Sequence, residues 1–252
     1  MSKQYAMVID LQKCVGCGAC AIACKTENNT QLRQDGQSFN WADFQYEVSG
    51  QFPDVSHTSR PLLCNHCSNA ACVEACPVSP KAMFKTDDGI TMHNNERCIG
   101  CRACQRECPY SQESVDIGQW SVISYNDEGK DTHQFFRNGT SLIAAGTASG
   151  AEMASRTRAV PPYQNSYSHP EYDAVRRSGI VEKCIFCDHR VKNGEQPYCV
   201  VSCPAGARVF GDINDSSSDA AGLLKKHKAG VLKPEAGTKP NVYYIRSFKV
   251  KG

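Results

Sequence analysis

The stretch Lys13-Cys-Val-Gly-Cys-Gly-Ala-Cys-Ala-Ile-Ala-Cys24 decides the fold, because it contains four cysteines in the spacing Cys-x2-Cys-x2-Cys-x3-Cys. The same spacing returns in Arg97-Cys-Ile-Gly-Cys-Arg-Ala-Cys-Gln-Arg-Glu-Cys108. Two further groups have one longer spacer: Cys64-x2-Cys67-x4-Cys72-x3-Cys76 and Cys184-x2-Cys187-x11-Cys199-x3-Cys203. The four groups use all 16 cysteines of the 252-residue chain. Their alternating spacings indicate duplication of a two-group unit.

Three kinds of cysteine chemistry compete for these groups. Disulfides are disfavoured, because cysteines at every third position would strain such bonds and the N-terminus shows no export signal. Zinc sites use Cys-x2-Cys pairs, but usually as two separated pairs. The Cys-x2-Cys-x2-Cys-x3-Cys run is typical of proteins with two [4Fe–4S] clusters, in which the fourth cysteine ligates the other cluster. The sequence therefore predicts four [4Fe–4S] clusters.

The second and third groups are expected to form one module, residues 59–126. Only 21 residues separate Cys76 from Cys98, and residues 82–93 are typical of two strands joined by a turn at Asp88-Gly89. A strand at 121–126 would close this module. Crossed ligation then joins Cys64, Cys67 and Cys72 with Cys108, and Cys98, Cys101 and Cys104 with Cys76.

The first and fourth groups are then expected to pair across the chain, in a discontinuous module of residues 1–58 plus 179–216. Predicted strands at 5–10 and 207–212 would be its outer strands. Crossed ligation joins Cys14, Cys17 and Cys20 with Cys203, and Cys184, Cys187 and Cys199 with Cys24; pairing of the groups in sequence order is the alternative. Residues 127–178 form an insert, and 217–252 a helix at 219–228 followed by an extended tail that packs on the domain or on a partner.

Composition and motifs exclude several functions. Lys and Arg number 28 against 26 Asp and Glu, so the net charge of +2 gives no electrostatic basis for binding nucleic acid. No apolar run approaches the length of a membrane span. Nucleophile–base pairs, Walker loops and dinucleotide fingerprints are missing, so we expect no catalytic residues in this chain. His66 and His189 are not needed as ligands, because each cluster already has four cysteines.

Basic residues next to the cysteines could raise the reduction potentials of the clusters. They are Lys13, Lys25, Arg97, Arg102, Arg106, Lys183 and Arg190.

The four groups, their alternating spacings and Cys64-Asn-His-Cys67 resemble the iron–sulfur subunit of respiratory molybdopterin oxidoreductases, the family of the dimethyl sulfoxide, polysulfide, thiosulfate, tetrathionate and arsenate reductases. The resemblance implies an α+β fold of two ferredoxin-like modules in pseudo-twofold relation, with long inserts and an extended tail. It also implies a non-catalytic subunit that relays single electrons through four clusters. Its partners would be a large subunit with a molybdenum bis-pterin cofactor and a quinol-reacting membrane subunit or cytochrome.

Finer features are most similar to the small subunits of arsenate respiratory reductases. They are Lys-Thr-Glu-Asn-Asn-Thr at 25–30, the insert, and the segment 233–248. We therefore expect arsenate as the terminal substrate, ahead of polysulfide, thiosulfate or tetrathionate. Cys108-Pro-Tyr-Ser departs from the Cys-Pro-Tyr-Gly of relatives, so residues 111–120 could reshape a partner contact.

The resemblance also implies a location. Relatives are exported together with a signal-bearing catalytic subunit, so we expect the periplasm rather than the cytoplasm. A polyferredoxin-type carrier of a hydrogenase or formate system is the alternative function, although a diffusing carrier has no need of the insert and the tail.

Overall fold

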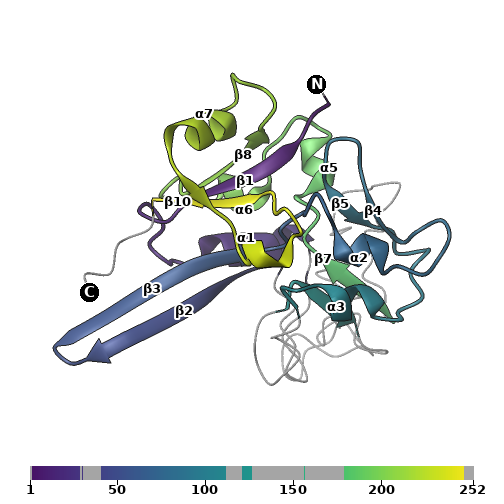
Figure 1. Ribbon diagram of the computed structural model, residues 1–252, viewed down its shortest axis with the longest axis horizontal. Coiled ribbons are helices and arrows are strands. Elements are labelled where there is room, and N and C mark those ends of the chain that lie inside the picture. Colours follow the sequence, from purple (N-terminus) through teal and green to yellow (C-terminus); the bar gives the residue numbers. More distant parts are fainter. Residues whose placement is uncertain are drawn as a thin grey trace.

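A four-stranded sheet brings the two ends of the described chain together (Figure 1). The computed structural model describes residues 2–28, 30, 41–111, 121–126, 156 and 179–246. The strand order is β8 (Arg208–Asp212), β1 (Tyr5–Asp10), β10 (Val242–Ile245) and β9 (Ala229–Gly230). β1 pairs antiparallel with β8 and parallel with β10. The predicted outer strands are thus confirmed as neighbours, and the tail supplies a strand to this chain's own sheet.

Alternation along these strands gives the sheet two different faces. Val8 and Ile245 point to one face, where they form a small core with Ala220 of helix α7 (Asp219–Lys226). Met7 and Phe210 point to the other face and join the main core, which contains many of the cysteines. The sheet therefore separates α7 from the cysteine groups.

Short helices accompany every cysteine group. They are α1 (Ala19–Asn28), α2 (Ala71–Glu74), α3 (Ala103–Glu107), α5 (Asp188–Val191) and α6 (Tyr198–Val201). The loops before them contain residues with positive φ. Among them are Gly16 and Gly100, both at +67°, and, at the equivalent motif positions of the other two groups, His66 at 44° and Phe186 at 53°. Left-handed backbone thus recurs at the same place in each motif.

Two small antiparallel pairs complete the part of the fold around the cysteines. β4 (Met83–Lys85) pairs with β5 (Thr91–His93), which confirms the predicted strand–turn–strand. β6 (Ile123–Asn126) pairs with β7 (Ile180–Lys183), the strand that leads into the fourth group. The strand predicted at 121–126 is therefore present from Ile123, and its backbone groups find their partners in a strand from beyond the insert.

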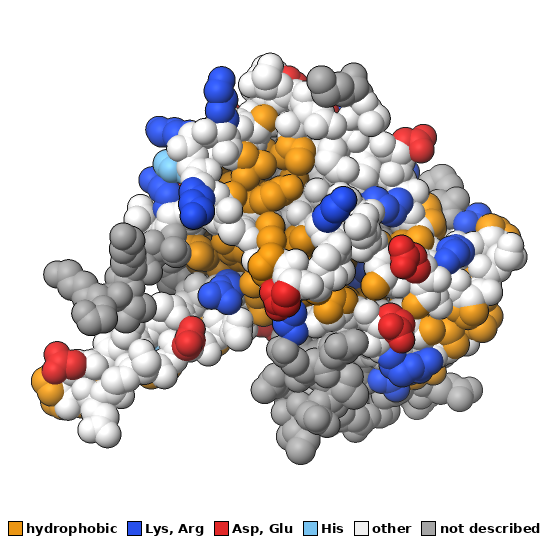
Figure 2. Space-filling model, in the orientation of Figure 1, with side chains coloured by type: hydrophobic (Ala, Val, Ile, Leu, Met, Phe, Trp, Pro, Cys, Tyr) orange, Lys and Arg blue, Asp and Glu red, His pale blue; other side chains and the backbone are white. Residues whose placement is uncertain are grey.

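A long hairpin, β2 (Ala42–Gln51) and β3 (Asp54–Leu63), projects from the body of the molecule (Figure 1). Its base is buried at Ala42 and Leu63, whereas Phe52 at the tip is 92% exposed. Figure 2 shows apolar side chains at this tip, and charges of both signs interspersed over the face of the molecule in view.

The C-terminal part follows the predicted helix and tail with small differences. α7 ends two residues before the expected boundary, at Lys226, and a 3-10 turn, η3 (Pro234–Ala236), interrupts the chain before β10. Residues 247–252 of the expected tail, and nearly all of the insert, lie outside the described residues. No helix in the described part of the chain is long and apolar enough to cross a bilayer.

Candidate metal centres

The structure gathers the sixteen cysteines into four sets of four thiols. All sixteen are described and all are free thiols. Each set takes three cysteines from one group and the fourth from another, as crossed ligation requires. We name the sets site A (Cys14, Cys17, Cys20, Cys203), site B (Cys24, Cys184, Cys187, Cys199), site C (Cys64, Cys67, Cys72, Cys108) and site D (Cys76, Cys98, Cys101, Cys104).

Site A lies at the base of the hairpin. Its four cysteines line a cavity of about 330 Å³ together with Phe44 of β2 and Pro61 of β3. Burial raises the pKa of Cys20, and the neighbouring thiols of Cys203 and Cys14 raise it further. The thiolate of Cys20 therefore needs positive charge nearby.

Site B is the most enclosed set, because all four of its cysteines are buried. The thiol of Cys24 lies among those of Cys184, Cys187 and Cys199, and burial together with these neighbours raises its pKa well above the ordinary value. Asn28 Nδ2 donates to Cys24 Sγ at 3.5 Å and to Cys187 Sγ at 3.9 Å. One amide of α1 thus links sulfur atoms from the first and fourth groups.

Site C surrounds a cavity of about 350 Å³. Burial raises the pKa of Cys108 to about 11, although Ser111 donates a hydrogen bond to its thiol. Tyr110 and Thr238 also line this cavity, and their hydroxyl groups are 2.7 Å apart. The tail before β10 therefore closes one wall of the site.

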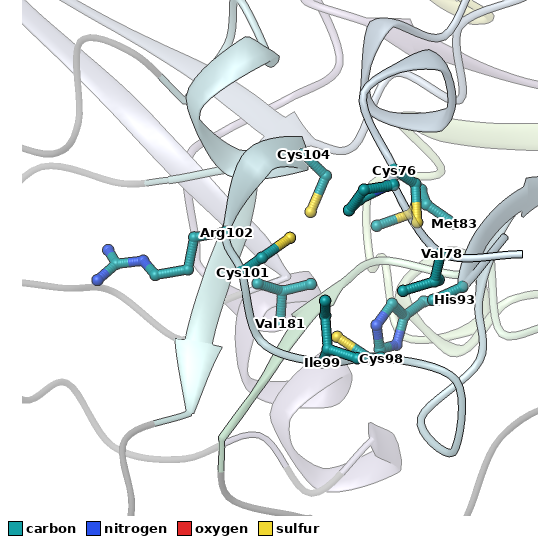
Figure 3. Close-up of a pocket in the computed structure, with 12 residues that line it drawn as sticks. Cys76, Val78, Met83, His93, Cys98, Ile99, Cys101, Arg102, Cys104 and Val181 are labelled. Atoms are coloured by element: carbon teal, nitrogen blue, oxygen red, sulfur yellow. The ribbon is translucent and has the colours of Figure 1, made fainter.

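Site D surrounds a cavity of about 310 Å³, and Figure 3 shows its sulfur atoms around one space. Burial raises the pKa of Cys104 to about 12, with the charges of Cys98, Cys101 and Cys76 adding to the effect. Arg102 points away from the sulfur atoms, toward the ring of Tyr125 at 4.9 Å.

The four sites form a row in the order A, B, C, D. Thiols of adjacent sites are close enough for their charges to interact; these pairs are Cys20 with Cys199, Cys184 with Cys64, and Cys72 with Cys104. Cys17 of site A and Cys101 of site D are exposed, whereas site B in the middle is buried. The row therefore reaches the surface at both ends.

The donor sets fit iron–sulfur clusters better than single ions. Each set joins three thiols of one group with a fourth from another group, which is the ligand arrangement of paired [4Fe–4S] clusters. Zinc sites usually take their cysteines as two separated Cys-x2-Cys pairs instead. Buried thiolates need positive charge between them, and the iron ions of a cluster supply it.

Backbone amides also point at the cysteine sulfur atoms. Gly100 N donates to Cys98 Sγ at 3.4 Å, Phe186 N to Cys184 Sγ at 3.4 Å and Ala207 N to Cys203 Sγ at 3.3 Å. Such bonds stabilise the charge on a cluster and tune its potential.

The basic residues chosen from the sequence lie in different surroundings. The guanidinium of Arg97 lies over the ring of Phe84 at 6.0 Å, and Arg190 pairs with Glu195 at 2.7 Å and with Glu27 at 3.5 Å. Lys183 is fully buried and donates to the carbonyl groups of Thr91 and Cys184, the latter at 2.8 Å.

Arg208 is a charged residue beside the thiols that sequence reasoning missed. It begins β8 and its side chain is buried beside Cys20 and Cys199. The available signal was its place in the strand, because Arg208 and Phe210 alternate with Val209 and so share the face that meets the main core.

The two histidines near the cysteines are held by other groups. Thr91 N donates to His66 Nδ1 at 3.1 Å, and His189 Nε2 bonds to Glu27 Oε1 at 2.8 Å. Each site has its four thiols without them.

Comparison with known proteins gives concordant results. Residues 55–121 and 138–213 match the 4Fe-4S dicluster domain family, and residues 5–26 match a 4Fe-4S binding domain. The chain is 46% identical over 249 residues to the arsenate respiratory reductase iron–sulfur subunit of Shewanella sp. (strain ANA-3), covering 98% of each protein. It is 33% identical to a putative dimethyl sulfoxide reductase iron–sulfur subunit of Halobacterium salinarum (96% of this chain, 78% of the relative). It is 32% identical to a tetrathionate reductase subunit of Salmonella typhimurium (96% and 72%). The chain, with its four sets of four thiols, therefore belongs to the 4Fe-4S dicluster domain family, and within it to the iron–sulfur subunits that transfer electrons in molybdopterin oxidoreductases.

Proposed function

We propose that this chain relays single electrons through four [4Fe–4S] clusters, between a quinol or cytochrome donor and a molybdenum bis-pterin catalytic subunit, in an anaerobic respiratory reductase. The observation that carries the proposal is the row of sites A to D, in which each site adjoins the next and both ends reach the surface. A [4Fe–4S] cluster takes up and releases one electron at a time. An uninterrupted row serves transfer across a protein, whereas a purely structural role needs no such order.

The residues of this chain would bind the clusters and keep water from them. Cysteine thiolates supply the ligands, and the amides of Gly100, Phe186 and Ala207 stabilise the negative charge. The buried walls of site B exclude solvent from the middle of the row.

Two partner contacts fit the two ends of the row. Val15 beside site A is 73% exposed and Ile99 beside site D is 66% exposed. They occupy equivalent positions in the first and third cysteine groups, next to the exposed Cys17 and Cys101. Exposed apolar side chains at an electron entry or exit point suit docking of another subunit. We assign the ends to the catalytic subunit and to the electron donor.

The proposed division into modules places sites A and B in residues 1–58 plus 179–216, and sites C and D in residues 59–126. His66 and Phe186, at equivalent motif positions, stack with ring centroids 3.6 Å apart. A pseudo-twofold axis passing between the modules would bring equivalent positions together in this way. This contact supports the pseudo-twofold arrangement.

Arsenate is the substrate we propose for the complex, and the periplasm its location. The first rests on the 46% identity to a subunit of an arsenate respiratory reductase, and the second on the sequence resemblance alone.

The test is to purify the protein anaerobically with its native partners and to measure iron, acid-labile sulfide, zinc and EPR spectra. We expect about 16 iron and 16 sulfide per chain, a co-purifying molybdenum subunit, and reoxidation of the reduced clusters by arsenate but not by tetrathionate. Zinc without sulfide would overturn the cluster assignment. A hydrogenase partner would favour the polyferredoxin alternative, and reoxidation by tetrathionate alone would overturn the choice of arsenate.

A further inference from the structure

Arg208 is a buried guanidinium without an ordinary partner. The residue is 2% exposed, and among the described residues none of its three side-chain nitrogens has a nitrogen or oxygen hydrogen-bond partner. Burying an unpaired cation is strongly unfavourable even after the protein relaxes around it, so such a residue needs a nearby negative charge.

The position of Arg208 shows where that negative charge belongs. β8 pairs with β1, and Arg208 lies opposite Ile9 on the face of the sheet that meets the main core. The groups whose charges act most strongly on it are the thiols of Cys199 and Cys20, from sites B and A respectively. The guanidinium therefore lies where two neighbouring sites meet.

A cluster with four thiolate ligands carries a net charge of about −2 when oxidised and becomes more negative on reduction. A fixed positive charge beside it favours the reduced form. Arginine suits this place because it stays protonated even when buried, whereas a buried lysine can lose its proton.

We propose that Arg208 is a fixed cation shared by the clusters of sites A and B, and that it raises the reduction potentials of both. It thereby acts as an electrostatic tuning residue for the end of the row that contains site A. This inference rests on the proposed function, since it requires clusters at both sites. Lys183 differs, because its ammonium group donates hydrogen bonds to two backbone carbonyl groups and lies near Cys72 of site C.

The decisive experiment compares midpoint potentials of the holoprotein, measured by EPR-monitored redox titration, in Arg208→Met and Arg208→Lys. We expect two of the four midpoints to shift to lower potential in Arg208→Met and the other two to stay unchanged. In Arg208→Lys the negative clusters on either side favour the protonated lysine, so the four midpoints should lie close to those of the unmodified protein. Lys226→Met is the matched control, because it removes a positive charge from α7 on the opposite face of the same sheet and should move none of the four midpoints.

Iron and sulfide content separates this inference from the proposed function. Fewer than four clusters in the unmodified protein would refute the proposed function itself. Full cluster content with unchanged midpoints in Arg208→Met would overturn the tuning role. If Arg208→Met loses clusters, the role of charge is still tested by Arg208→Gln and Arg208→Lys. If only the lysine variant keeps its full cluster content, the positive charge is what the site needs, which supports the proposal. If all three variants lose clusters, Arg208 acts through its packing and the proposal is overturned.

Discussion

At the residue scale, the loops between the cysteines depend on a left-handed backbone conformation, which residues with a Cβ adopt only at a steric cost. Gly16 and Gly100 lie directly before the second cysteine of their groups, each with a φ of +67°. A left-handed residue here turns the chain so that successive thiols face one cavity. Glycine adopts this conformation without the steric cost that a Cβ brings.

Gly100→Ala should destabilise the holoprotein by about 1–3 kcal/mol, because it adds backbone strain and a steric conflict. A Cβ at this position would lie only 2.1 Å from the carbonyl oxygen of Gly179, which precedes β7. Thermal denaturation under anaerobic conditions measures the effect. Gly222→Ala in α7 is the control, since a Cβ there meets nothing within 4 Å and should stabilise the helix by up to about 1 kcal/mol. Equal melting temperatures for the two variants would contradict this account.

Cys24→Ser should damage site B and leave site A intact, although Cys24 follows Cys14, Cys17 and Cys20 in the sequence. The reason is that the Cys24 thiol lies among those of Cys184, Cys187 and Cys199. EPR spectra and iron content of the variant provide the measurement, with Cys20→Ser as the control that should damage site A. The crossed pairing would be wrong if both variants lost the same signal.

At the element scale, side chains alternate between the two faces of the main sheet, and this alternation decides which of them meet the cysteines. In β8, Val209 packs toward α7 while Arg208 and Phe210 face the main core. The helix α7 covers the side of the sheet that is turned away from the cysteines (Figure 1). Substitutions in α7 should therefore change the stability of the fold without changing cluster binding.

Ser218→Ala should cost about 1 kcal/mol of stability without changing iron content. Ser218 is the N-cap of α7, and its hydroxyl oxygen accepts a hydrogen bond from Ala221 N at 3.2 Å. Ser216→Ala, in the exposed turn just before it, should leave the melting temperature unchanged. Loss of iron from Ser218→Ala would show that α7 and the clusters are coupled after all.

The hairpin β2–β3 is the element that sequence reasoning missed. The signal was present in β2, where Phe44, Tyr46 and Val48 alternate with Gln45, Glu47 and Ser49, the period-2 pattern of a strand. The pattern is weaker in β3, whose first seven residues are mostly polar and exposed.

At the scale of the whole molecule, the clusters replace part of an apolar core. The main core contains Cys24, Cys104 and Cys199 among its buried side chains, next to Met7 and Phe210. Iron and sulfide would fill the space between these buried thiols, where other proteins pack apolar side chains.

Removal of iron should therefore unfold most of the chain rather than empty four preformed sites. Anaerobic chelation followed by circular dichroism and limited proteolysis measures this. We expect loss of secondary structure and rapid cleavage, with recovery after reconstitution with iron and sulfide. A protease-resistant apoprotein with its full secondary structure would contradict this prediction.

The sequence by itself determined the ligand chemistry, because cluster ligation constrains local spacing within each run of cysteines. It also indicated strands such as Tyr5–Asp10, where hydrophobic and β-branched residues are concentrated. Crossed ligation also predicted which thiols share a site, and the structure gathers the same four sets. Only the tertiary structure decided the order of the four sites and the burial of Arg208 between two of them. Those two features depend on contacts between residues far apart in the sequence, such as Cys20 and Cys199, and local spacing carries no information about such contacts.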